Sequence, residues 1–261
     1  MNKSATIDFA TASNAPAQTQ ALLELVAGEA RDSLLGVHDV LRRELPQGRV
    51  AIYEAGGGSS SFLPMDVLAR SHVTVVDIDE DQVRNNTYAD KAILGDVQTY
   101  RFGPETFDVV ICYNVIEHLP DVEAALLNFR DALKRGGMIL IGAPNPHSLS
   151  GVVTKYSPHW FHVWFYRNIR GIRNAGLPGE PPFPTFFHPL VTLPKLEAFA
   201  AAHGLETIYR REVESPRYPE MRQRKPLFAA LVDAGAALMN AVLPGGTDVR
   251  RGDYHIILRK R

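Results

Sequence analysis

The chain has 261 residues, of which 45% are hydrophobic and 22% are charged, so it can bury one substantial core and is not fibrous or disordered. The formal net charge of −1, without an extended basic stretch, argues against nucleic acid as substrate. The single cysteine, Cys112, has no partner for a disulfide or a metal cluster. We therefore expect a cytoplasmic protein without a metal site.

The N-terminal region, residues 1–48, predicts a loose tail followed by two cap helices. Its first 20 residues lack the basic and apolar regions of a secretory signal. Apolar residues recur at helical spacing between residues 16 and 43, and Pro46 and Gly48 then end the pattern. The main domain is expected to begin at residue 49.

From residue 49 onward, apolar strands alternate with helices. Strands are predicted at 49–54, 72–78, 91–96, 107–114 and 138–143, with helices at 63–70, 80–88 and 121–134. Two further strands, 204–214 and 254–261, end the chain. This order predicts an α/β fold with a Rossmann-like, doubly wound and mostly parallel sheet of seven strands, completed by a C-terminal antiparallel hairpin.

Two segments interrupt the predicted domain at residues 49–261. Residues 145–190 are rich in aromatic residues, proline and glycine, and we expect them to form an irregular insertion after the fifth strand. This insertion is interpreted as a lid over a substrate, with a second core or a subunit interface as an equal alternative. The second insertion, about residues 215–250, contains an apolar helix at 227–243 that is shorter than the roughly 20 residues needed to span a bilayer.

A glycine-rich turn follows the first strand directly, in the sequence Glu54-Ala-Gly-Gly-Gly58. Glycines at this point let the backbone approach a ligand without a clash from Cβ. Asp77 ends the second strand, where a carboxylate can accept hydrogen bonds from ribose hydroxyls. Asp96 ends the third strand and is suited to an adenine amino group, although a turn cap explains it equally well.

The region at about 49–145 resembles the class I S-adenosylmethionine-dependent methyltransferases, particularly their small-molecule group. The motifs that carry the resemblance are, in order, EAGGG, VVDID, LGDV, FDVVICYNVIEHLPD and LKRGGMILI. The last two are the most discriminating, because dehydrogenases with a similar sheet do not show them. The resemblance implies transfer of a methyl group from S-adenosylmethionine to O, N or C of a small acceptor, such as a sugar, a lipid or a biosynthetic intermediate.

The resemblance also implies the residues of the cofactor site. The methionine moiety would be held by Glu54, Gly56, Gly57 and Gly58, the ribose and adenine by Asp77 and Ile78, and the adenine border and site wall by Asp96, Val97 and Asn114.

Histidines are the candidates for a general base, which a hydroxyl acceptor would need near neutral pH. His118 follows the fourth strand and is the first candidate, although a structural hydrogen-bonding role weighs more heavily for it. His159 and His162 flank an aromatic pair in the insertion and are further candidates. Each of them is more often a packed histidine than a base.

The charge distribution bears on the partners. Residues 1–130 contain 10 basic and 19 acidic residues, whereas residues 131–261 contain 18 basic and 10 acidic residues. The basic half suits an anionic acceptor or a carrier, although an ordinary solvated surface is the simpler interpretation. The helix at 227–243 suggests peripheral membrane contact, with core or homodimer packing as the favoured alternative.

Two other functions remain as alternatives. A nicotinamide-dependent oxidoreductase would use a similar sheet, but the chain lacks the further loop glycine expected after Gly58 and a suitably placed tyrosine and lysine pair. A non-catalytic S-adenosylmethionine-binding regulator would share the cofactor site. The long aromatic insertion argues against a regulator, because a sensor needs no acceptor chamber.

Overall fold

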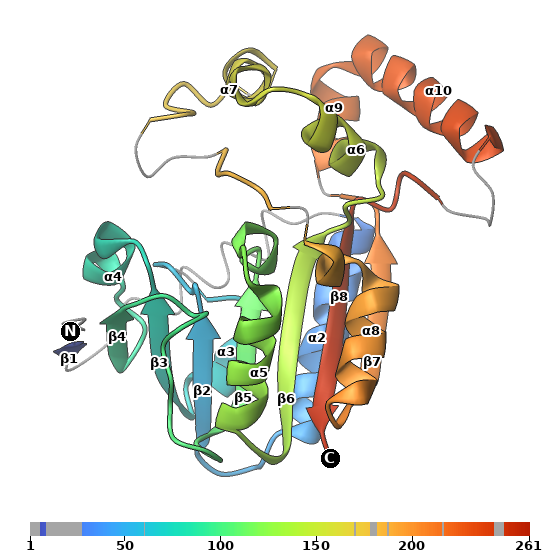
Figure 1. Cartoon of the computed structure of the whole chain (residues 1–261). Coiled ribbons are helices and arrows are strands. Elements are labelled where there is room, and N and C mark those ends of the chain that lie inside the picture. The colour runs from blue at the N-terminus through green and yellow to red at the C-terminus, as the bar shows by residue number, and fades with distance from the viewer. Residues whose placement is uncertain are drawn as a thin grey trace.

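The computed structural model describes residues 6–8, 28–59, 61–169, 171–177, 182–186, 188–215, 217–242 and 248–261. Its strands are β1 (Thr6–Asp8), β2 (Val50–Ala55), β3 (Ser71–Asp77), β4 (Lys91–Leu94), β5 (Phe107–Tyr113), β6 (Leu133–Pro144), β7 (Leu205–Val213) and β8 (Asp253–Lys260). They form one sheet in the order β1-β4-β3-β2-β5-β6-β8-β7 (Figure 1).

The sheet confirms the predicted Rossmann-like class. Strands β4, β3, β2, β5 and β6 run parallel, and β8 pairs antiparallel with both β6 and β7. The expected seven strands are therefore present. The structure adds β1, which pairs antiparallel with β4 at the sheet edge, so part of the expected loose tail belongs to the sheet.

The helices outside the second insertion are α2 (Glu29–Glu44), α3 (Met65–Leu68), α4 (Glu80–Asn85), η1 (Ile116–His118), α5 (Val122–Ala132), α6 (Leu149–Tyr156), α7 (His159–Asn168), η2 (Pro189–Val191) and α8 (Leu193–Ala202). Side-chain caps fix two of the starts: Asp79 accepts from two backbone amides of α4, and Asp121 accepts from one of α5. Within 28–48 the helix α2 lies where one of the two expected cap helices was placed; the expected helical positions before residue 28 lie outside the described residues.

The core lies on both faces of the sheet. Along β5, Val110 and Cys112 face one apolar cluster, and Val109 and Ile111 face the other, as the two-residue period of a strand requires. Helices α5 and α8 cover the first face, and α2 and α3 cover the second (Figure 1). Burial on both faces explains why the strands are almost continuously apolar.

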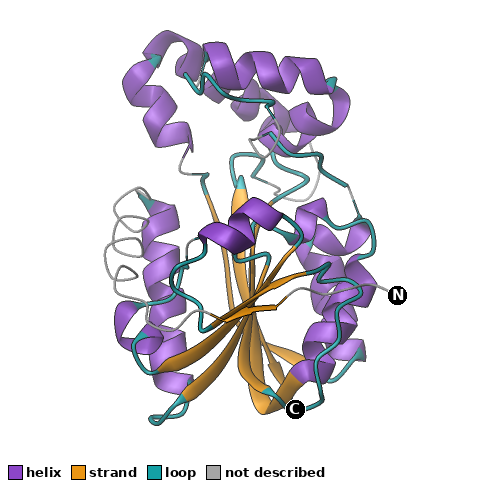
Figure 2. Ribbon diagram, turned by 90° about the vertical axis from the view of Figure 1, so that its left-hand side faces the viewer, coloured by secondary structure: helices purple, strands orange, loops and turns teal. Residues whose placement is uncertain are grey.

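Four helices lie beyond the carboxyl ends of the central strands and form what we call the helical lid: α6, α7, α9 (Arg217–Arg224) and α10 (Pro226–Val242) (Figures 1 and 2). The insertion expected at 145–190 contains two helices, α6 and α7, that were not predicted from the sequence. A ring contact between Phe165 and Phe228, with centroids 6.4 Å apart, joins α7 to α10. Among the described residues, no helix is long and apolar enough to cross a membrane.

Candidate cofactor and acceptor sites

The predicted cofactor residues follow four adjacent parallel strands, β4, β3, β2 and β5. Because parallel strands end at the same sheet edge, the glycine loop, Asp77, Asp96 and Asn114 come to one side of the molecule. The amide of Gly95 donates to the carbonyl oxygen of Asp77 at 2.8 Å, which ties the end of β4 to the end of β3.

The glycine loop is joined directly to Asp77. Gly56 and Gly58 have φ angles of 66° and 54°, in the left-handed region that favours glycine. One carboxylate oxygen of Asp77 accepts from the Gly58 amide at 3.0 Å, and the other accepts from the Asp79 amide at 2.9 Å. The side chain is buried, and burial raises its pKa. Asp77 therefore fixes the loop while its remaining acceptor capacity faces the strand ends.

Glu54 is buried beneath the glycine loop, where two hydroxyl groups donate to its carboxylate. Tyr88 donates to Oε2 at 2.7 Å, and Ser61 donates to Oε1. Burial raises the pKa of Glu54 to about 7, against the opposing effect of these two hydrogen bonds. Helix α3 begins after Pro64 without a side-chain cap, and Ser61 holds Glu54.

The raised pKa of Glu54 predicts a pH-dependent contribution to stability. The folded state retains a proton between the unfolded pKa of 4.5 and the folded pKa of about 7, so the free energy of unfolding falls as pH rises through this window. Relative to Glu54→Gln, the wild type should lose up to about 3 kcal/mol between pH 4.5 and pH 7. Denaturant unfolding of both proteins across this range measures the difference, and a constant difference would contradict the prediction.

The residues expected around the adenine show contrasting environments. Ile78 is 75% exposed and presents an apolar side chain beside the end of β3. Val97 is buried in the core, and Asp96 accepts from the backbone and side chain of Gln98. Ile78 thus offers a face that a planar base could cover, whereas Val97 forms the floor of the turn.

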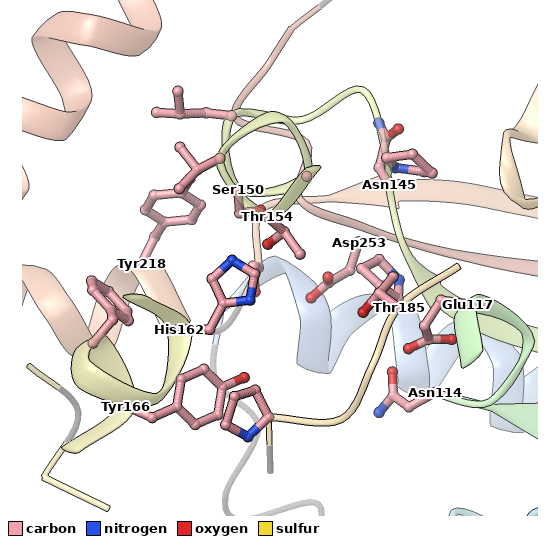
Figure 3. A pocket seen from close by; sticks show the side chains of 18 of the residues that line it. Asn114, Glu117, Asn145, Ser150, Thr154, His162, Tyr166, Thr185, Tyr218 and Asp253 are labelled. Atoms are coloured by element: carbon pink, nitrogen blue, oxygen red, sulfur yellow. The ribbon is translucent and has the colours of Figure 1, made fainter. Parts of the chain in front are cut away.

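Beneath the helical lid is a cavity of about 1080 Å³. Apolar side chains dominate its wall, and the polar groups shown in Figure 3 are Asn114, Glu117, Asn145, Ser150, Thr154, His162, Tyr166, Thr185, Tyr218 and Asp253. His162 and Tyr166 face Asn114 and Glu117 across the space (Figure 3). The few polar groups among apolar walls are typical of a binding site for a small molecule.

Phe62 and Tyr113 separate this cavity from the glycine loop. Their rings stack with centroids 4.0 Å apart, and both line the large cavity as well as a small one beside Glu54, Gly56 and Gly57. The Tyr113 hydroxyl lies 2.7 Å from Nε2 of His255. The cofactor edge and the acceptor cavity are therefore neighbours that share one aromatic wall.

His255 continues a buried hydrogen-bonded chain to Ser33 on α2, with its Nδ1 2.7 Å from the serine Oγ. Burial lowers the pKa of His255 to about 4, so it is neutral at pH 7. Sequence reasoning missed this group because Tyr113, His255 and Ser33 are distant along the chain and carry no motif. The chain of hydrogen bonds fixes the Tyr113 ring between the two sites.

His118 lies in the cavity wall on the same side as Asn114. Its Nδ1 donates to the carbonyl oxygen of Pro184 at 2.7 Å, which leaves the lone pair on Nε2. Burial lowers the pKa of His118, so the ring is neutral at pH 7. Nε2 is 3.7 Å from Oε1 of the buried Glu117.

His162 also lines the cavity, whereas His159 does not. Ser157 donates to the carbonyl oxygen of Val153 at 2.5 Å, so its oxygen accepts from Nε2 of His162 at 2.7 Å. Burial and the neighbouring His159 lower the pKa of His162. His159 is exposed on α7 and is absent from the cavity wall, which separates it from the other two candidates.

Residues 53–141 match a family model described as a methyltransferase domain. This segment contains the glycine loop, Asp77, Asp96 and Asn114. The chain thus carries a methyltransferase domain on a Rossmann-like sheet, and both findings support an enzyme that transfers methyl groups from S-adenosylmethionine. No curated protein matches the chain in sequence.

Several solved structures share the fold. One described as a putative S-adenosylmethionine-dependent methyltransferase from Listeria monocytogenes is 14% identical, with a TM-score of 0.55 over 87% of this chain and 98% of its own. Magnesium protoporphyrin IX methyltransferase from Synechocystis, with bound S-adenosylhomocysteine, is 12% identical, with a TM-score of 0.53 over 93% of this chain and 86% of its own. A putative sarcosine dimethylglycine methyltransferase from Galdieria sulphuraria is 15% identical, with a TM-score of 0.53 over 89% and 88%.

Proposed function

We propose that the enzyme methylates a small molecule with a large apolar part, which binds in the cavity beneath the helical lid. The cavity carries this proposal, because its volume of about 1080 Å³ lies mostly between apolar side chains and its wall includes Asn114, a predicted cofactor residue. We assign residues 49–261 to one methyltransferase domain, whose insertions at about 145–190 and 215–250 build the lid.

The cofactor site in this proposal is the sheet edge formed by Glu54, the glycine loop, Asp77, Ile78, Asp96, Val97 and Asn114. The residues fit a nucleoside: the loop lacks Cβ atoms, Asp77 provides carboxylate oxygens for ribose hydroxyls, and Ile78 offers an exposed apolar face. S-adenosylmethionine supplies an activated methyl group on a positively charged sulfur. Glu54 supports the loop from below through Ser61 and Tyr88.

We assign His118 as the general base for a hydroxyl acceptor. Its Nε2 carries the lone pair because Nδ1 donates to Pro184. When Nε2 takes the acceptor proton, the charged ring faces the Glu117 carboxylate at 3.7 Å, which stabilises the new charge. His162 faces Asn114 across the cavity and is assigned to positioning the acceptor (Figure 3). His159 has no role in this scheme because it is outside the cavity wall.

Replacing Asp77 with alanine should weaken S-adenosylhomocysteine binding by about 1–3 kcal/mol, or roughly 5–150-fold, because ribose hydroxyls would lose their acceptor. Isothermal calorimetry measures this change directly. Asp81→Ala provides a control, because Asp81 is on the nearby helix α4 and its carboxylate pairs with Arg84 at the surface. Equal affinity in wild type and Asp77→Ala would remove Asp77 from the site.

A screen of acceptors tests the class of substrate. Detergent-dispersed lipidic alcohols, polyketide-like phenols and small polar sugars would be compared by acceptor-dependent release of S-adenosylhomocysteine. The proposal expects turnover with bulky apolar acceptors and little with the polar set. Turnover restricted to the polar set would contradict the assignment of the lid cavity.

A further inference from the structure

On helix α10 the exposed residues are apolar, and the polar residues are the ones that pair within the protein. None of its exposed residues is polar, and its two polar residues, Asp233 and Asn240, are both held by the protein. Arg222 donates to Asp233 at 2.9 Å, while Asn240 donates to Asp248 at 2.8 Å and accepts from the Val249 amide at 2.8 Å. A helix on a water-facing surface normally turns its polar residues outward.

The apolar exposure on α10 is large. We call Leu227, Leu231, Leu238 and Val242 the outer face of α10; their side chains are 89%, 70%, 68% and 74% exposed. Helices α7 and α10 both lie on the far side of the lid from the sheet (Figures 1 and 2). On α7, Trp160 and Trp164 are 68% and 46% exposed. Contiguous exposed apolar residues of this size mark a surface that another apolar phase covers.

The exposed apolar residues are continuous with the acceptor cavity. Leu231 of α10 and Trp164 of α7 line the cavity while they are exposed to the outside. Apolar side chains therefore extend from the interior of the cavity to the outer surface of the lid, and the exposed basic residues Arg224 and Lys225 also line the cavity. A molecule with a long apolar part and an anionic group suits this combination.

The charge of the lid distinguishes between the candidate partners. The sequences of α6, α7, α9 and α10 contain five lysine or arginine residues and two acidic residues. A second copy docked through the same face would bring together two lids that both have an excess of basic residues. An anionic lipid surface complements both the basic residues and the apolar outer face.

We propose that the helical lid docks on the surface of an anionic phospholipid bilayer through the outer face of α10 and the two tryptophans of α7. The apolar residues enter the boundary between headgroups and acyl chains, and the basic residues lie at headgroup level. The cavity mouth then opens toward the lipid phase. The docking proposal depends only on the exposed residues of the lid. The further step, in which an acceptor enters the cavity from the bilayer, rests on the proposed function.

The chain contains its own reporter for this test, because Trp160 and Trp164 are its two tryptophans. Phosphatidylcholine vesicles that contain phosphatidylglycerol should sediment with the protein and shift its tryptophan emission to shorter wavelength, as the rings leave water. Pure phosphatidylcholine vesicles should bind less, and added salt should weaken binding to the anionic vesicles.

The triple variant Leu227→Ser, Leu238→Ser and Val242→Ser tests the outer face. None of these residues lines the cavity, so turnover with a detergent-dispersed acceptor should be retained. We expect vesicle binding to fall by at least about tenfold, because burial of even one such side chain is worth more than the 1.4 kcal/mol that a tenfold change represents. Leu35→Ser is the matched control, since Leu35 is 41% exposed on α2, away from the lid.

Docking would be overturned if the wild type did not bind anionic vesicles. It would also be overturned if the triple variant, with its fold intact by circular dichroism, bound vesicles as well as the wild type does. A third contradicting result is a wild type that binds no vesicles and forms a dimer, which becomes a monomer in the triple variant. The last result would assign the face to a second copy. Failure of the proposed function is separate, because it appears as absent turnover in detergent while vesicle binding persists.

Discussion

Replacing His118 with glutamine is expected to lower kcat with a hydroxyl acceptor by about 10²–10⁴-fold, the usual contribution of a general base. Glutamine retains a hydrogen-bond donor for the Pro184 carbonyl oxygen but offers no lone pair basic enough to take the acceptor proton. Affinity for S-adenosylhomocysteine should be unchanged. Single-turnover kinetics at saturating acceptor measures the chemical step.

The pH profile distinguishes a base from a structural histidine. Because burial lowers the pKa of His118, the ring stays neutral to below the usual histidine range. The wild-type kcat/KM should therefore fall only on the acid side, with an apparent pKa below that of a free histidine, and this acid limb should be absent from His118→Gln. His159→Gln is the control, because His159 is exposed outside the cavity wall. An equal loss of kcat in His118→Gln and His159→Gln would assign His118 a structural role. An acid limb that survives in the pH profile of His118→Gln would do the same.

Replacing Gly56 with alanine should cost about 2–5 kcal/mol of stability, with about 1–2 from the left-handed backbone and about 1–3 from overpacking. Gly56 has a φ of 66°, and an added Cβ would lie 2.5 Å from Cγ2 of Val115. Val115, which adjoins Asn114, would have to move, so the affinity for the cofactor should fall as well.

Chemical denaturation and calorimetric titration measure both effects of this substitution. Gly48→Ala is the matched control, because an added Cβ there meets nothing within 4 Å. Equal stability of the two variants would show that the loop tolerates a side chain at Gly56 and is not packed closely against Val115.

The sheet and its cofactor edge could be predicted from sequence because their signals are local. The strands β2, β3 and β5 are apolar runs that lead directly to Gly56, Asp77 and Asn114. Parallel pairing then brings these ends together without any information about distant contacts.

The partners of the site could not be predicted, because they depend on long-range packing. Tyr88 reaches Glu54 from 34 residues away, and His255 reaches Tyr113 from 142 residues away, in segments without a motif. The helices α6 and α7 were missed because prolines and aromatic residues obscure the helical period of their short sequences.

The orientation of α10 was also beyond the sequence. Its apolar residues predict a buried helix, and only the structure shows that Asp233 pairs with Arg222 and Asn240 with Asp248 while the apolar residues are exposed. The aromatic insertion likewise left a lid and a second core or subunit interface as equal alternatives, and the cavity beneath α6 and α7 supports the lid that we propose.

A crystal structure of the protein with S-adenosylhomocysteine tests the central assignment most directly. The account predicts ribose hydroxyls at hydrogen-bond distance, about 2.6–3.2 Å, from Asp77, with the sulfur directed past Asn114 toward the cavity beneath the lid. A ligand bound away from the glycine loop, or a sulfur that points away from that cavity, would contradict it.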